Sequence, residues 1–340
     1  MNLICLYGIK EHYLAIETSC DETCCAIINQ AGRVLSNTVF SQEAIHSEFG
    51  GVLPDIASKN HTEKITYVID KSLKDSGLTL TDIKKVFVTN GPGLVNCLMI
   101  GVTAAKTISL INNIPIYPIN HIEGHIASCF LESKIAFPAL CLVVSGGHTS
   151  LYILKNQINF ELIGNTIDDA AGEAFDKGAK ILGLGYPGGV KIDQITKNGN
   201  SNFHKFPIAN LGKNSLNFSF SGLKTSLKYF VEKNNNWIKN KESIAASYQE
   251  AIVDSLIEKI FLANKIHKTS SILICGGVAC NSRLRYKVAK KFGNNSKIII
   301  PSLEYCTDNA AMIAMRGLQL KNSDSYEKGF GVFSSIKKLV

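Results

Sequence analysis

Two histidines spaced four residues apart, His121 and His125, are the side chains with the clearest capacity for chemistry. On a helix this spacing puts both imidazoles on one face, where they reach toward the same point. One divalent metal can take both, and a carboxylate from elsewhere would complete the site. Glu123 stands at the third position of the stretch, not the second, so it points away from this face and is badly placed as a metalloprotease base.

The pair alone is a weak signal, and its surroundings strengthen it. Residues 114–120 read as an apolar strand that runs directly into the histidine helix, and residues 139–144 as a buried strand that ends in the turn 145–149, SGGHT. Active sites of α/β proteins gather at strand ends in this way. Asp308, before the last predicted helix, is the best-placed distant carboxylate to join the histidines, and its alternative role is that of a helix N-cap.

Length and composition bound the class of protein. The chain has 340 residues, 45% hydrophobic and 19% charged, which predicts a globular α/β enzyme with two lobes. No run approaches eighteen apolar residues, and residues 1–12 lack a signal-peptide pattern, so we expect no membrane contact and a cytoplasmic location. The predicted lobes are residues 1–130 with 310–340, and residues 131–309.

Charge and cysteine usage add two expectations. The net charge of +8 fits an anionic partner such as RNA, although surface solubility explains many such charges. The ten cysteines form no CxxC pair, and several stand in apolar stretches. We therefore expect reduced cysteines that serve as small core residues.

A strand–polar turn–strand unit begins near residue 13 and another near residue 139, which predicts an architectural duplication. In the first unit the turn 18–23 carries acids and hydroxyls, which suits a phosphate-plus-metal site or a plain β-turn. Residues 41–54 read as a loop. Residues 271–281 read as a strand, a Gly-Gly turn and a helix start, an arrangement that can cradle a nucleotide.

Eight motifs in register resemble the TsaD family, the tRNA adenosine threonylcarbamoyltransferases, and together they cover nearly all of residues 13–320. They are 16–23 (IETSCDET), 121–125 (HIEGH), 144–149 (VSGGHT), 168–176 (DDAAGEAFD), 186–189 (YPGG), 218–225 (FSFSGLKT), 276–281 (GGVACN) and 306–309 (CTDN). One departure is Cys280, where the family usually has Ser or Ala before the asparagine.

The resemblance implies the actin/Hsp70/sugar-kinase (ASKHA) fold, with two RNase-H-like lobes around a nucleotide cleft. It implies transfer of a threonylcarbamoyl group from threonylcarbamoyl-AMP to N6 of adenosine 37 in tRNAs that read codons beginning with adenine. It places the metal ligands on His121, His125 and Asp308, with Fe²⁺ the expected metal and Zn²⁺ the alternative. It places the substrate contacts on nine positions: Val143, Val144, Ser145, Gly146, Gly147, Asp176, Gly189, Asp193 and Asn281. The implied protein partners are TsaB-like and TsaE-like, with a TsaC-like enzyme supplying the adenylate.

This reaction would need a base for the amine proton, and Asp21 in the first polar turn is the candidate, with turn capping as its alternative role. Three rival functions remain to be weighed. A metalloprotease is disfavoured by the position of Glu123. An ATP-dependent kinase of the same fold has little use for a two-histidine metal site, and a non-catalytic nucleotide-binding scaffold has no need to keep all three ligands.

Overall fold

The computed structural model describes residues 11–293, 297–320 and 329–334, and these form two compact units. Unit 1 contains the described parts of 1–44, 52–132 and 308–340, and unit 2 contains 45–51 and 133–307. The lobes expected from the sequence had their boundaries at residues 130 and 309, which put Asp308 in the second lobe. In the structure Asp308 lies in unit 1, together with His121 and His125.

Unit 1 is built on a five-stranded mixed sheet in the order β3-β2-β1-β4-β5. β2 is antiparallel to β1 and β3, whereas β4 and β5 run parallel to β1. The central strands are buried on both faces, as expected for a sheet covered by helices on both sides. The strands are β1 His12–Glu17, β2 Glu22–Asn29, β3 Val34–Ser41, β4 Ile83–Gly91 and β5 Ile116–Asn120.

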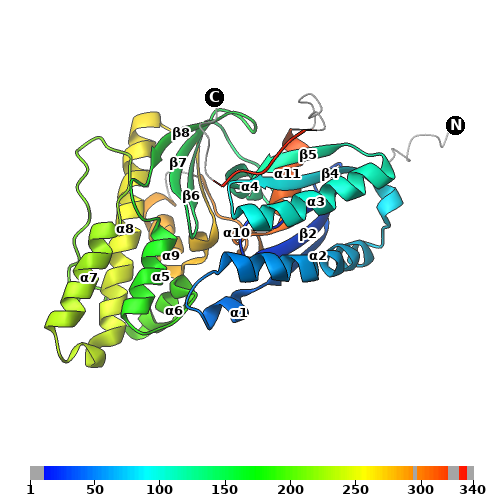
Figure 1. Cartoon of the computed structure of the whole chain (residues 1–340). Helices are drawn as coiled ribbons and strands as arrows, with labels where there is room; N and C mark the ends of the chain where they lie inside the picture. The colour runs from blue at the N-terminus through cyan, green and yellow to red at the C-terminus, as the bar shows by residue number, and fades with distance from the viewer. Residues whose placement is uncertain (1–10, 294–296, 321–328, 335–340) are drawn as a thin grey trace. The chain divides into compact units, whose positions relative to one another are not determined.

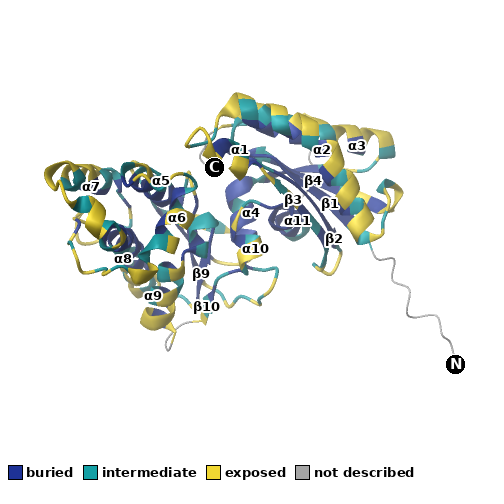
Figure 2. Cartoon of the chain, turned by 90° about the horizontal axis from the view of Figure 1, so that it is seen from below, coloured by how far each residue is buried: buried dark blue, intermediate teal, exposed yellow. Residues whose placement is uncertain are grey.

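Two pairs of helices cover this sheet. α2 (Pro54–Ser76) and α3 (Val95–Asn112) pack on one face, and α4 (His121–Ser128) and α11 (Ala310–Gln319) pack on the other, with the buried strands between them in Figure 2. Gly77 ends α2 in the left-handed conformation, as its sequence position indicated.

The expected loop at 41–54 is partly wrong, because residues within it form a short helix, α1 (Glu43–Ser47).

α3 is long and apolar enough, by length and composition, to cross a membrane, which differs from the expectation that no run approaches this. In this structure, however, its buried side packs on β4 and α2 through residues such as Leu98, Val102 and Ala105. α3 is therefore a covering helix of the α/β layer, whose opposite side is exposed.

Unit 2 repeats the architecture of unit 1, which confirms the predicted duplication. Its sheet has the order β8-β7-β6-β9-β10, with the first three strands antiparallel and the last two parallel to β6, the same connectivity as β3-β2-β1-β4-β5. Both sheets can be followed by colour in Figure 1. The strands are β6 Ala139–Val144, β7 Thr149–Leu154, β8 Phe160–Asn165, β9 Ser271–Cys275 and β10 Lys297–Ile299.

The core of unit 2 forms around α8, most of whose side chains are buried. The hydroxyl of Tyr248 on this helix donates to the carbonyl of Ala174 at 2.9 Å, which satisfies the one polar atom of a fully buried ring. The helices of unit 2 are α5 Ala171–Ile181, α6 Gly188–Ile195, α7 Ser221–Lys233, α8 Lys241–His267, α9 Ser282–Phe292 and α10 Leu303–Cys306.

The short 3₁₀ turns of the two units are Leu80–Asp82 in unit 1, and Thr196–Asn198, Trp237–Asn240 and Gly277–Cys280 in unit 2.

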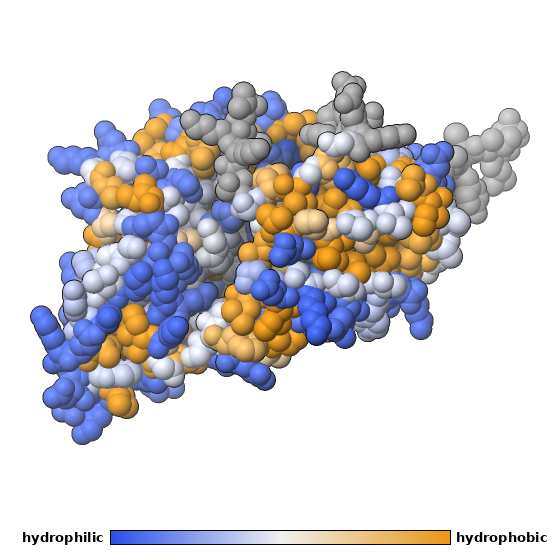
Figure 3. Space-filling view, viewed as in Figure 1, coloured by the Kyte–Doolittle hydropathy of each residue, from blue (hydrophilic) through white to orange (hydrophobic). Residues whose placement is uncertain are grey.

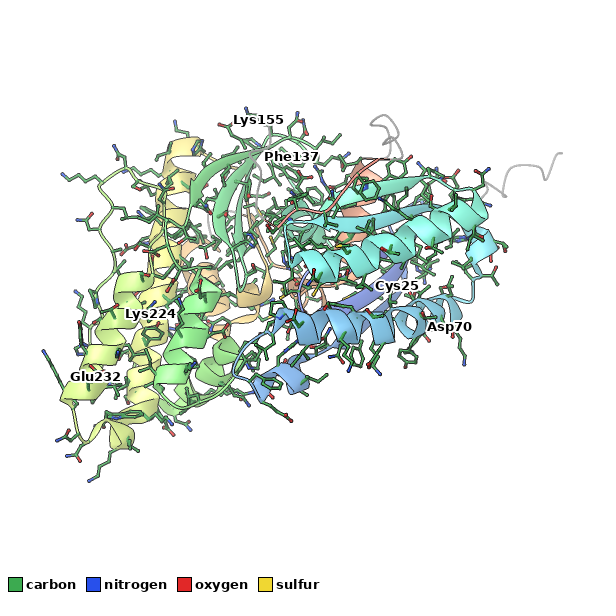
Figure 4. The ribbon with its side chains drawn as sticks, in the orientation of Figure 1. Cys25, Asp70, Phe137, Lys155, Lys224 and Glu232 are labelled. Carbon is green, nitrogen blue, oxygen red and sulfur yellow. The ribbon has the colours of Figure 1, made fainter. Side chains whose placement is uncertain are left out.

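Nine cysteines lie within the described residues, and all nine are free thiols. Seven of them are buried, including Cys25 in the interior of β2, which is labelled in Figure 4. This confirms the expectation of reduced core cysteines for the seven buried ones, whereas Cys20 and Cys280 are free thiols that are only partly buried.

Candidate functional site

The histidine helix α4 starts where it does because Asn120 caps it. The Asn120 side-chain oxygen accepts from the amides of Ile122 and Glu123 at 2.9 and 3.2 Å. β5 therefore leads directly into His121, the first helical residue, and His125 follows one turn later on the same side. The ring centroids of the two histidines lie 4.7 Å apart.

Asp308 joins these two histidines. Its Oδ1 lies 3.1 Å from Nε2 of His125 and 3.6 Å from Nε2 of His121, and the three ligand atoms all lie within 4.8 Å of one another. The alternative N-cap role of Asp308 is wrong, because Asn309 caps α11 by accepting from the amide of Met312 at 3.0 Å. The carboxylate of Asp308 is therefore left directed to the histidine pair.

The residues present fit a divalent metal. His125 is fully buried, and neither of its ring nitrogens makes a hydrogen bond; its Nε2 has only the ion-pair contact with Asp308 at 3.1 Å, and a metal bound at Nε2 would give it a ligand bond. Two imidazole nitrogens and one carboxylate oxygen form a donor set typical of iron or zinc sites with open coordination positions. Among the residues that the structure describes, this is the group of three such side chains that could hold a metal ion.

Glu17, at the end of β1, holds the first histidine in place. Its Oε2 lies 3.1 Å from Nδ1 of His121, and its Oε1 accepts from the amide of Ser19 at 2.5 Å. The hydroxyl of Thr89 also donates to Glu17. A carboxylate on Nδ1 favours the tautomer that leaves Nε2 free for a metal. The sequence reasoning missed this role, although Glu17 lies inside the quoted motif 16–23.

The electrostatics of this pair favour a charged carboxylate. Burial alone would raise the pKa of Glu17, but the charge of His121 and its hydrogen bond bring it below the usual value. In the absence of a metal, burial would lower the pKa of His121, but Asp308 and Glu17 together raise it to about 9. The pocket of negative charge that favours an imidazolium equally favours a bound cation.

Glu123 faces away from the metal group, as its spacing predicted, and has a structural partner. Its Oε2 accepts from Nε and NH2 of Arg316 on α11 at 2.8 and 2.7 Å. Arg316 is only 3% exposed. This buried ion pair joins the helix that carries both histidines to the helix that follows Asp308.

Asp21, the candidate base, lies in the turn between β1 and β2 and is 8% exposed. Its side chain interacts electrostatically with that of Glu22, its neighbour. Burial, followed by the charge of Asp21, raises the pKa of Glu22 well above its usual value. The two acids are therefore electrostatic neighbours in this turn.

The nine positions assigned to substrate contact all belong to unit 2, and the structure brings several together at the carboxyl end of β6. Val143 and Val144 are buried within β6, and Ser145, Gly146 and Gly147 form the turn that follows, closed by the amide of Ser145 donating to the carbonyl of His148 at 2.8 Å.

Two glycines allow neighbouring loops to approach this turn. A side chain at Gly172, on α5, would come within 2.4 Å of the carbonyl of Ser145, and one at Gly276, after β9, would come within 2.4 Å of the carbonyl of Val144. Gly276 also has a φ of 94°, a conformation that favours glycine. The backbone of α5 at Gly172 and the backbone after β9 at Gly276 therefore both lie close to the end of β6 and the turn that follows it.

The remaining assigned residues hold helix starts. Asp176 accepts from the amide of Gly188 at 2.7 Å, next to Gly189 at the start of α6. Asp193 accepts from the hydroxyl of Ser282 at 2.8 Å. Asn281 caps α9 by accepting from the amide of Leu284 at 2.9 Å, and its amide group donates to Gln249 at 2.8 Å.

Within the acidic stretch 168–176, Asp176 holds the start of α6, whereas Asp168 and Asp169 make a second set of contacts. Asp168 accepts from the amide of Phe220 at 2.8 Å and the hydroxyl of Ser219 at 2.5 Å, and Asp169 pairs with Lys224 at 3.1 Å. Lys224, on the α7 segment, is labelled in Figure 4. Asp168 and Asp169 therefore contact the motif 218–225.

Comparisons with known proteins agree with the motif pattern. The family model for TsaD, described as tRNA N6-adenosine threonylcarbamoyltransferase, matches residues 33–315. The chain belongs to the TsaD family. A TsaD relative from Syntrophus aciditrophicus is 47% identical over 319 residues, covering 93% of this chain and 94% of the relative. Another, from Bacillus subtilis, is 46% identical over 325 residues, covering 94% and 92%. Both carry the name tRNA N6-adenosine threonylcarbamoyltransferase.

Solved structures confirm the ASKHA fold expected for a TsaD-family chain. HypF from T. kodakarensis is similar with a TM-score of 0.64 at 13% identity, over 92% of this chain and 48% of that one. Component A of the (R)-2-hydroxyglutaryl-CoA dehydratase of Acidaminococcus fermentans is similar with a TM-score of 0.56 at 14% identity, over 91% and 98%. At these identities the likeness concerns the fold alone.

Proposed function

We propose that this chain transfers the threonylcarbamoyl group of threonylcarbamoyl-AMP to N6 of adenosine 37 in tRNAs that read codons beginning with adenine. The amine nitrogen attacks the carbamoyl carbon, the bond from that carbon to the phosphate oxygen breaks, AMP leaves, and one proton is lost from N6. The observation that carries the proposal is the group of His121, His125 and Asp308, intact in a chain that the TsaD model matches over residues 33–315. Because the substrate is tRNA, we place the protein in the cytoplasm.

In unit 1, His121, His125 and Asp308 would hold one divalent metal, for which we propose Fe²⁺, with Zn²⁺ as the alternative. Bound there, the metal would supply Lewis-acid stabilisation of negative charge on the donor. Glu17 orients His121 through Nδ1, and the buried surroundings of His125 keep water from its ring. A kinase or a scaffold gains nothing from this arrangement, which is why we place both second.

In unit 2, we propose that the turn of Ser145, Gly146 and Gly147 binds phosphate or a developing oxyanion through backbone amides. Gly146 and Gly147 are exposed, and no atom lies within 4 Å of where a side chain would stand on either. Asp176, Gly189, Asp193 and Asn281 would hold the nucleoside of the donor. Because an aromatic amine is a poor nucleophile, positioning and charge stabilisation supply most of the acceleration.

We further propose Asp21 as the base that takes the N6 proton. Replacing Asp21 by Asn should lower the single-turnover transfer rate by about 10²–10⁴-fold, whereas Glu22→Gln, which keeps the size of the neighbouring side chain, should leave it nearly unchanged. The pH dependence of the free energy of unfolding gives a second readout. Since the pKa of Glu22 is raised in the folded protein, the contribution of Glu22 to stability is present below the usual glutamate pKa and is lost as pH rises through the raised pKa. Glu22→Gln should remove that decline in denaturation curves. Equal activity of Asp21→Asn and wild type would exclude Asp21 as the base.

We propose that a TsaB-like partner docks on the exposed side of α3 and that a TsaE-like protein joins the same assembly. Figure 3 shows hydrophobic residues gathered over this part of unit 1. Leu110 and Ile111 are 82% and 76% exposed, and Met99 and Val95 on the same helix are 52% and 40% exposed. Exposed apolar surface of this extent is typical of protein–protein contacts.

The double change Leu110→Lys/Ile111→Lys should weaken binding of the TsaB-like protein by about 100-fold, because it puts two charges into an apolar interface. The control is Leu303→Lys on α10, another exposed leucine, at 61% exposure. Titration calorimetry measures both. Unchanged affinity in the double variant would place the partner elsewhere.

The overall function is tested by an in-vitro transfer assay. Unmodified tRNA that reads a codon beginning with adenine, ¹⁴C-threonine, bicarbonate and ATP are supplied with the adenylate-forming enzyme, the two partners and this chain. We expect label in tRNA only when this chain is present. Absence of label, in a mixture that a reference TsaD renders active, would reject the transferase proposal and favour the kinase or the scaffold.

A further inference from the structure

α9 carries a concentrated positive charge in unit 2. Its eleven residues, Ser282–Phe292, include five lysines and arginines and no acid. The stretch of α8 that lies beside its second half, residues 256–268, adds three lysines against one acid, Glu258. The local net charge is therefore strongly positive. Such a charge is balanced either by acidic side chains within the protein or by an anionic ligand.

Four of the five basic residues fall into two rows with different partners, and the fifth, Arg285, donates to the carbonyls of Ala279 and Pro301. The inner row is neutralised, since Arg283 pairs with Glu250 at 2.7 Å and Lys287 pairs with Glu250 at 2.5 Å and with Asp254. The outer row is not. Lys290 and Lys291 are exposed and make no ion pair with any residue that the structure describes. Internal neutralisation therefore explains the inner row only.

Exposed aromatic rings alternate with the outer charges. Tyr286 is 54% exposed and lies between the guanidinium of Arg283, 5.3 Å from its ring centroid, and the ammonium of Lys290, 5.9 Å away. Phe261 on α8 is 47% exposed beneath Lys291 at 4.7 Å. Lysines that contact phosphates beside rings that stack on bases or riboses are the combination with which proteins bind single-stranded and loop regions of RNA.

This surface begins at residues already assigned to the donor. Asn281 caps α9, and Asp193 binds Ser282, its first residue. From that end an eleven-residue helix extends about 16 Å, the span of a few nucleotides of an RNA strand. The basic surface thus leads away from the proposed nucleoside-binding residues along one helix.

We propose that Tyr286, Lys290 and Lys291, with Phe261 of α8, form the surface of unit 2 that binds the tRNA backbone next to the adenosine to be modified. We call this set the α9 basic face. The proposal rests on the proposed function, and it ranks these lysines above the other exposed lysines of the chain. The lysines position the RNA through phosphates, and the rings add sequence-independent stacking.

The test compares Lys290→Gln/Lys291→Gln and Tyr286→Ala with a matched control on α7. There, Tyr229 is 57% exposed and Lys233 stands four residues later, the same spacing as Tyr286 and Lys290. Binding of unmodified tRNA to the complete assembly is measured at several salt concentrations, and the transfer rate is measured at saturating tRNA.

The double lysine variant should bind tRNA about 10-fold more weakly at low salt, and the slope of log affinity against log salt should become shallower by about 2, one unit for each phosphate contact. Tyr286→Ala should weaken binding by about 10-fold with no change in slope. Transfer at saturating tRNA should stay at the wild-type rate, and Tyr229→Ala and Lys233→Gln should match wild type throughout.

Wild-type affinity and slope in the α9 variants, in an assembly that modifies tRNA, would overturn the α9 basic face and leave the proposed function standing. Loss of a protein partner with unchanged tRNA binding would also overturn it, since the face would then belong to that partner. A wild-type assembly that neither binds nor modifies tRNA would overturn both proposals together.

Discussion

Replacing His125 by alanine is expected to lower the rate of threonylcarbamoyl transfer by about 10³-fold or more, because the change removes one of two imidazole ligands and with it several kcal/mol of charge stabilisation. The variant should also bind less metal. Elemental analysis of the purified chain measures the metal content, and transfer of ¹⁴C-threonine to tRNA measures the rate. His121→Ala should behave in the same way, since Asp308 lies near both rings.

The control for this experiment is His267→Ala, which removes an exposed histidine in the last turn of α8. It should keep both the metal content and the rate of wild type. A His125→Ala protein that is folded, contains no metal and still modifies tRNA at the wild-type rate would reduce the histidine pair to a structural role.

Replacing Glu17 should lower metal binding as well, but by less than the loss of a histidine does. Glu17→Gln keeps the size of the side chain but removes the charge on Nδ1 of His121, so metal affinity should fall by about 10–100-fold, and excess metal should restore activity. Competition with a chelator of known affinity measures this change.

Replacing Glu123 by alanine is expected to destabilise unit 1 by about 3–5 kcal/mol, because it leaves the guanidinium of Arg316 buried without its carboxylate. Arg316 is 3% exposed, so its guanidinium is shielded from water in the intact protein. Denaturant unfolding followed by circular dichroism measures the loss. The rate of transfer at low temperature should change little in the folded fraction, since Glu123 does not face the metal ligands.

Two further variants separate the charge effect from simple loss of a side chain. Glu63→Ala removes an exposed glutamate from α2 in the same unit and should change stability by less than about 0.5 kcal/mol. Glu123→Met combined with Arg316→Met removes both charges and should recover much of the stability lost in Glu123→Ala. If Glu123→Ala were as stable as Glu63→Ala, the ion pair would not hold α4 to α11.

Local features were predictable from the order of residues because they depend on neighbours along the chain. The four-residue spacing of His121 and His125 was enough to put both rings on one side of a helix, and alternating apolar runs with polar turns indicated the repeated strand unit. Motif register also indicated the TsaD family. The short helix α1 was missed because its polar residues resemble a loop.

Contacts between distant segments required the tertiary structure. Nothing along the chain indicates that Glu17 binds His121, that Arg316 neutralises Glu123, or that Asn309 rather than Asp308 caps α11. Likewise, the lysines of α9 look equivalent in sequence, and only the packing of α8 beside them neutralises one row and leaves the other exposed. The sequence by itself determined the family, the repeated strand–turn–strand unit and the placing of two histidines on one face of a helix, because these follow from short-range periodicity and motif spacing. The packing of helices and strands decided which buried charges meet and which surface charges stay free, because the energy of a charge depends on its neighbours in space.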